Sequence, residues 1–114
     1  MMRVCEIVPR IHEEASGPTY TVPRLSIALA SHGIDTSLAC LDVGEPRHFE
    51  GVEQLRFKPD AMLERLGRSQ QMKRWFEANA QKFSIIHSHS LWMMPNVYSG
   101  VSANRFQVPY VVSP

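Results

Sequence analysis

The sequence is poor in cysteine and has no long hydrophobic run. Its only two cysteines, Cys5 and Cys40, each lie in an apolar run with no second cysteine nearby. This spacing favours two buried free thiols over a disulfide framework or a metal knuckle. The apolar runs are far shorter than the ~20 residues that cross a bilayer, and neither a secretion signal nor an internal repeat is visible. We therefore expect a cytoplasmic protein.

The composition is that of an ordinary globular domain, or of a piece of one, with 44% apolar and 20% charged residues in 114. The net charge of +1 is unevenly spread, because residues 56–82 hold seven basic residues against three acidic ones. A basic helix here has two interpretations. It either packs its apolar stripe on a sheet with its arginines solvated, which we favour, or lies on the inner face of the plasma membrane. The membrane interpretation uses Arg65, Arg68, Lys73 and Arg74, and nucleic acid is not an expected partner.

Hydrophobic periodicity predicts alternating strands and helices. Strands are expected at 3–9, 35–43, 51–57, 83–89 and 108–113, and helices at 19–32, at 60–81 with a break at Gly67, and at 93–105. With right-handed crossovers, this order predicts an α/β fold of Rossmann-like type. The sheet is expected to be doubly wound, mainly parallel and five-stranded, with strand order 3-2-1-4-5 and a fully buried fifth strand.

The chain is organised around the stretch 83–92, F-S-I-I-H-S-H-S-L-W. Its apolar start suits a central strand covered on both faces. His87 and His89 are two residues apart, so their side chains point to the same side of that strand. Ligands of open parallel sheets bind beyond the carboxyl ends of the strands, which is where these histidines are expected.

A second feature is expected at the same edge of the sheet. Ser16, Gly17 and Pro18 form a small-residue turn between the first strand and the first helix, and such a turn directs backbone N–H groups and the positive helix end toward an anion. The G-x-G-x-x-G fingerprint is absent. In the predicted strand order this turn and the stretch 87–92 flank the point where the chain reverses direction.

Glu6 is the one charged residue inside the first predicted strand. A carboxylate in a central strand is costly unless it is paired. Glu6 is therefore either bonded to a nearby partner, which we favour, or turned toward the crevice.

The histidine pair has three interpretations. The rings are structural, or they are metal ligands like those of metal-dependent hydrolases, or they hydrogen-bond sugar hydroxyls while Trp92 offers an apolar face to the sugar ring. The metal interpretation has little support, because no further histidine or aspartate cluster follows the pair. A small flavodoxin-like module that binds a nucleotide or an anion is a non-enzymatic alternative.

Three motifs resemble the N-terminal domain of family-4 glycosyltransferases. They are V-P followed by S-G-P-T-Y-T-V-P-R-L-S-I-A-L-A-S-H-G, then I-I-H-S-H-S-L-W, and finally V-P-Y-V-V-S-P, in the family's order over nearly the whole chain. The resemblance implies a GT-B fold, in which a first Rossmann-like domain mainly binds the acceptor and a second binds the nucleotide-sugar.

The resemblance also implies an activity and a set of site residues. Such enzymes transfer a sugar from a UDP- or GDP-sugar with retention of configuration, usually without a metal, to cell-surface polysaccharide or lipid-linked acceptors. The turn at Gly17 matches the loop that approaches the donor phosphates, and His87 and His89 match the acceptor side. The 114 residues correspond to an incomplete first domain without the nucleotide-sugar domain, so the chain alone is expected to be inactive.

Overall fold

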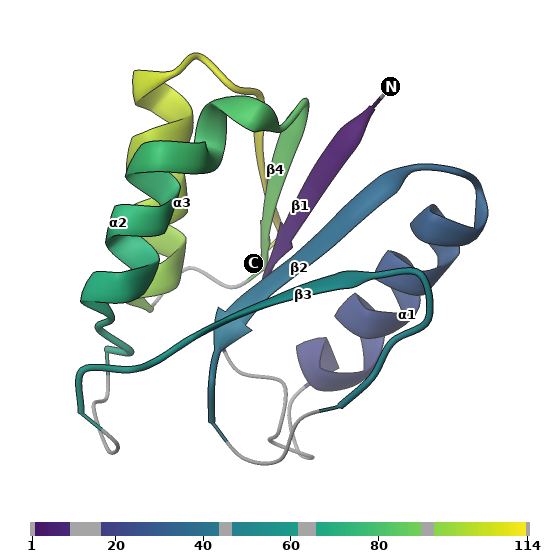
Figure 1. Ribbon diagram of the computed structural model, residues 1–114, viewed down its shortest axis with the longest axis horizontal. Coiled ribbons are helices and arrows are strands. Elements are labelled where there is room, and N and C mark those ends of the chain that lie inside the picture. The colour runs from purple at the N-terminus through teal and green to yellow at the C-terminus, as the bar shows by residue number, and fades with distance from the viewer. Residues whose placement is uncertain (1, 10–16, 44–46, 62–65, 90–92, 114) are drawn as a thin grey trace.

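The computed structural model describes residues 2–9, 17–43, 47–61, 66–89 and 93–113. Its centre is a five-stranded sheet with the order β3-β2-β1-β4-β5, and all four strand pairs are parallel (Figure 1). This confirms the predicted α/β class and strand order. Each strand is shorter than its predicted range: β1 is Arg3–Ile7, β2 is Asp35–Leu41, β3 is Glu53–Phe57, β4 is Ile85–His89 and β5 is Tyr110–Ser113.

In the described part of the chain, three α-helices cover the sheet. Helix α1 (Gly17–Ser31) packs on one face, and α2 (Gln70–Asn79) and α3 (Met94–Arg105) lie side by side on the other (Figure 1). Gly33 follows α1 with a φ of +81°, which suits the left-handed end of a helix. Ser69 caps α2, because its Oγ accepts a hydrogen bond from the backbone N–H of Met72. A short 3₁₀ turn, Ala80–Lys82, follows α2 directly.

The larger hydrophobic core lies between the sheet and helices α2 and α3. Phe76 and Met72 of α2 are fully buried there against Ile86 and other strand residues. The Trp75 and Phe76 rings meet edge to face, with their centroids 5.1 Å apart. Buried apolar side chains such as these contribute most of the stability of a small domain.

A smaller core lies beneath α1. Val22 of α1 is fully buried there against Leu38 and Cys40 of β2 and Val8, which follows β1. This cluster covers the half of the sheet built from β1 and β2. Both cysteines are free and buried, as predicted, with Cys40 in this core and Cys5 in the larger one.

The prediction of a fully buried fifth strand is wrong. Among the described strands, β5 is an edge strand that pairs only with β4, and the residues Val111 and Val112 are 47% and 38% exposed. A run of apolar residues indicates a strand but does not say whether another strand and a helix will cover it. Among the described helices, α1 covers only the other half of this face, and Val111 stays open to solvent.

Candidate functional site

The candidate site is built where β1 and β4 lie side by side. These strands pair in parallel, and Glu6 is directly opposite His87 in their register. Side chains opposite each other in paired strands point to the same face, and His89 is two residues further along β4. Two strands about eighty residues apart in sequence therefore direct a carboxylate and two imidazoles to the α1 face.

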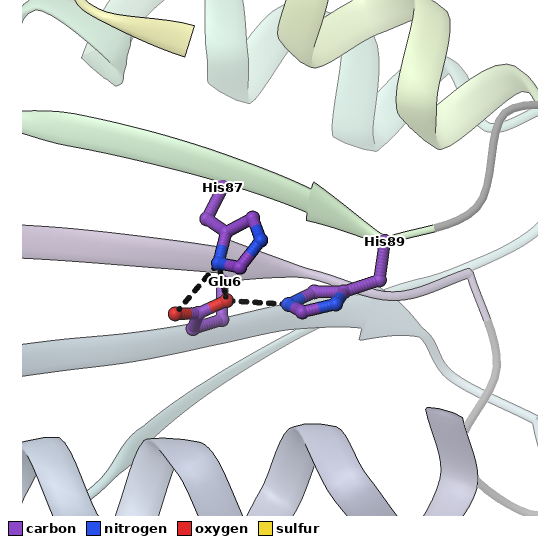
Figure 2. A group of neighbouring side chains, drawn as sticks. All are labelled: Glu6, His87 and His89. Carbon is purple, nitrogen blue, oxygen red and sulfur yellow. Dashed lines mark hydrogen bonds and ion pairs between the residues drawn. The ribbon is translucent and has the colours of Figure 1, made fainter. Parts of the chain in front are cut away.

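The carboxylate of Glu6 bridges both histidines (Figure 2). Its Oε2 atom is 2.6 Å from Nε2 of His89 and 3.0 Å from Nδ1 of His87. The two imidazole centroids are 4.1 Å apart. Glu6 is only 1% exposed, so these contacts replace the hydration that the carboxylate loses on burial.

Further polar side chains hold the two histidines in place. Nε2 of His87 is 2.8 Å from Oγ of Ser113 on β5. Asn96, in the first turn of α3, donates from Nδ2 to the carbonyl oxygen of His89 at 3.0 Å and to Oγ of Ser88 at 2.7 Å. Helix α3 thereby fixes the carboxyl end of β4 from the opposite face of the sheet.

This hydrogen-bond arrangement determines which ring nitrogens are available. An ionised carboxylate only accepts hydrogen bonds, so Nδ1 of His87 and Nε2 of His89 carry the protons directed at Glu6. Nε2 of His87 is then an acceptor for the Ser113 hydroxyl. Nδ1 of His89 has no hydrogen-bond partner among the described residues, which leaves it as an acceptor for a ligand.

The cysteines are not candidates for nucleophilic chemistry. Burial raises the pKa of Cys40 from 9.0 to about 11, and it raises the pKa of Cys5 still further. Only the thiolate is a good nucleophile or metal ligand, so both thiols are inert at neutral pH.

The start of helix α1, which holds Gly17 and Pro18 of the predicted turn, lies at the same edge of the sheet as the histidines (Figure 1). Helix α1 begins at Gly17, has Pro18 in its first turn, and starts at the edge where the parallel strands end (Figure 1). Because β1 and β4 are parallel neighbours, their carboxyl ends are adjacent in the sheet. Ser16 and Trp92 lie outside the described residues.

The basic segment lies away from the histidines, beside α2 and α3. Arg68, Lys73 and Arg74 are exposed there, and Arg65 lies outside the described residues. Arg68 and Lys73 line a groove of about 390 Å³ between α2 and α3, together with the acidic Asp60 and Glu77. Both signs of charge are present in this groove, and attachment to an anionic membrane stays a prediction.

Sequence reasoning found the histidine pair but not the full cluster. It favoured structural pairing for Glu6 over a place in the crevice. The structure shows Glu6 paired, but its partners are the two crevice histidines, which are distant in sequence and which the sequence did not name. The usable signal was a lone carboxylate in β1 and an H-x-H pattern on the strand predicted to lie next to it. Ser113 and Asn96 carried no such signal, because single serines and asparagines are common at strand and helix ends.

The fold agrees with a comparison against known protein families. Residues 16–114 match the family described as glycosyl transferase 4-like domain. The matched region includes His87 and His89, whereas Glu6 precedes it. No curated protein matches the chain. None of the described helices is long and apolar enough to span a bilayer. The match extends over most of the chain, which therefore belongs to the glycosyl transferase 4-like domain family.

Proposed function

We propose that this chain is the acceptor-side domain of a glycosyltransferase and that His87 and His89 contact the saccharide acceptor. In this proposal the enzyme uses a nucleotide-sugar such as a UDP- or GDP-sugar and retains the configuration of the transferred sugar. The acceptor is a growing cell-surface polysaccharide or a lipid-linked saccharide. Most donor contacts come from a second domain facing this one, and the turn at Ser16, Gly17 and Pro18 approaches the donor phosphates.

The observation that carries the proposal is the position of the cluster. Both histidines lie at the carboxyl end of β4, the place where open parallel sheets bind ligands. The chain's membership of a glycosyltransferase family gives that place its chemistry. It also favours sugar transfer over the metal-dependent hydrolase and the small anion-binding module.

The tautomers set by Glu6 suit a sugar hydroxyl. Nδ1 of His89 accepts a hydrogen bond from such a hydroxyl, because Nε2 already donates to Glu6. Trp92, which we place beside the acceptor, would stack its indole on the apolar face of a sugar ring. The buried carboxylate keeps both rings in place before the acceptor binds, which reduces the entropy lost on binding.

Saccharide binding to the chain tests this proposal. Imidazole signals are followed by NMR while glucose, mannose, galactose or N-acetylglucosamine is added. We expect at least one sugar to shift the ring signals of His89 and His87, and we expect His89→Ala to abolish the effect. His48 is exposed and far from β4 in sequence, so His48→Ala is the matched control and should bind as the unchanged chain does.

Two results would contradict the proposal. One is the absence of any shift at His87 and His89 with all four sugars, and the other is an unchanged response in His89→Ala. A separate assay with UDP- and GDP-sugars addresses the donor. We expect the chain by itself to transfer no sugar, so measurable turnover would refute the assignment of the donor residues to a second domain.

A further inference from the structure

The cluster at the end of β4 has the composition of a metal site as well as that of a hydrogen-bonded triad. Glu6, His87 and His89 each offer one ligand atom, and these three atoms lie within 4.8 Å of one another. Two imidazole nitrogens and one carboxylate oxygen form a ligand set that suits zinc and neighbouring transition metals. Magnesium and calcium prefer ligand sets made of oxygen.

We propose that Glu6, His87 and His89 bind one divalent transition-metal ion, for which Zn²⁺ is the probe. The ion takes the place of the ring protons that now point at Glu6. It is bound by Oε2 of Glu6, Nδ1 of His87 and Nε2 of His89, and its remaining coordination position is open to water or to a ligand.

The present distances are close to those of a zinc site. Zinc binds nitrogen and carboxylate oxygen at roughly 2.0–2.2 Å, so ligand atoms in a tetrahedral site are about 3.4 Å apart. Oε2 of Glu6 is already 3.0 Å from Nδ1 of His87 and 2.6 Å from Nε2 of His89. The ion therefore requires the carboxylate to separate from each ring nitrogen by less than about 1 Å, and the two ring nitrogens, which lie within 4.8 Å of each other, to be about 3.4 Å apart. Small side-chain rotations supply both changes.

The surroundings meet two further requirements of a metal site. The histidine ligand needs an outer partner on its second nitrogen, and Nε2 of His87 is 2.8 Å from Oγ of Ser113. An ion also needs a path of entry. A mainly apolar hollow of about 320 Å³ reaches Glu6 and His87 from the solvent side, between α1 and the open half of the sheet.

Charge also favours a cation in this place. Glu6 is only 1% exposed, and the apolar side chains of Val4 and Leu25 line the same hollow. With both imidazoles neutral, the cluster has a net charge of −1, and a divalent ion changes it to +1 while coordinating the carboxylate directly. On binding, the proton of each ring moves from the coordinating nitrogen to the opposite one, so that Nε2–H of His87 donates to Ser113.

Zinc titration of the purified chain tests the proposal. After treatment with a chelator, the chain is titrated with ZnCl₂ by calorimetry, and a parallel sample receives CoCl₂ to record the visible absorption of a low-symmetry cobalt site. We expect one ion per chain and no comparable heat with MgCl₂. Glu6→Gln and His89→Ala should each weaken binding at least tenfold, and Ser113→Ala about tenfold.

Matched variants separate this site from other zinc ligands. His48→Ala and Cys40→Ala should bind zinc as the unchanged chain does, because His48 is exposed and remote in sequence and Cys40 is a buried thiol. If a cluster variant does not fold, the unchanged chain still decides the question. One equivalent of Zn²⁺ should then shift the NMR signals of the His87 and His89 rings and leave those of His48 in place.

The proposal is overturned if the chain binds no stoichiometric zinc, or if zinc shifts His48 as strongly as His87 and His89. Unchanged affinity in folded Glu6→Gln and His89→Ala would also overturn it. These outcomes are independent of the saccharide experiment, since either ligand is measured in the absence of the other.

Discussion

The two faces of the sheet differ in how much apolar cover they have. Helices α2 and α3 together bury the larger core on one face, whereas α1 is the one helix of the described residues that covers part of the other (Figure 1). The buried charged residue Glu6 lies on the α1 face with both histidines, and the same face holds the open hollow. One face mainly stabilises the fold, and the other combines a small core with the polar cluster.

This difference has a physical reason. Imidazoles and a carboxylate are tolerated inside a protein only when they have hydrogen-bond partners, and they bind ligands only when solvent reaches them. The thinner cover of the α1 face allows His87 to remain 19% exposed at its side chain while Glu6 is buried beneath it. A second closely packed helix at that place would exclude a ligand.

The largest expected effect is the loss of core packing on the α2 and α3 face. Phe76→Ala should lower the free energy of unfolding by about 3–5 kcal/mol, because it removes a fully buried ring and leaves a cavity. Val22→Ala, beneath α1, should lower it by only about 2 kcal/mol. Urea unfolding followed by circular dichroism measures both values. An equal loss of unfolding free energy in Val22→Ala and Phe76→Ala would contradict the stated difference between the two cores.

A double-mutant cycle on the α1 face should give a smaller effect. His89→Ala leaves the Glu6 carboxylate short of a partner, so it should cost more in the unchanged chain than in the Glu6→Leu variant. We expect a coupling energy of about 1–3 kcal/mol between the two positions. Ser69 lies on the opposite side of the sheet, and the pair His89→Ala and Ser69→Ala should be additive within about 0.5 kcal/mol. A coupling energy near zero for Glu6 and His89 would mean that their contact does not stabilise the fold.

The last effect concerns the two thiols, one on each face, and it appears only at alkaline pH. The pKa of Cys40 is raised from 9.0 to about 11 by burial, and that of Cys5 is raised further. Between pH 9 and the raised pKa, a thiol keeps its proton in the folded chain but loses it in the unfolded chain. The stabilisation from each thiol is therefore fully present below pH 9 and falls as the pH rises above it. In that range each thiol should lower the free energy of unfolding by about 1.4 kcal/mol per pH unit.

Unfolding free energies measured from pH 8 to pH 10.5 check this prediction. The unfolding free energy should fall less in Cys40→Ala and in Cys5→Ala than in the unchanged chain, and least in the double variant. The fall that remains in the double variant measures the titration of lysine and tyrosine. An equal fall in all four proteins would contradict it. The unfolding free energy falls until the pH reaches the pKa of the folded thiol. The fall due to Cys5 should therefore continue to a higher pH than the fall due to Cys40.

Much of the fold was predictable from local patterns. The alternation of apolar strands with helical stripes predicted the α/β class. The strand order that is usual for doubly wound sheets was expected, and the structure confirms it. The exposure of Val111 and Val112 was not predictable, because a short run of β-branched residues indicates a strand but does not say what will pack on its two faces. The candidate site was likewise predictable only in part from the local sequence. The spacing of His87 and His89 showed that their rings share a face, but their contact with Glu6 depends on a register between strands about eighty residues apart.

The sequence by itself determined the elements, their order and the presence of three unusual polar residues in two apolar strands, since side-chain alternation and helix periodicity are local properties. Only the tertiary structure decided that Glu6 bridges His87 and His89 and that Ser113 and Asn96 hold them. The physical reason is that the contacts depend on strand pairing, and the register of paired strands is set by the packing of the whole sheet.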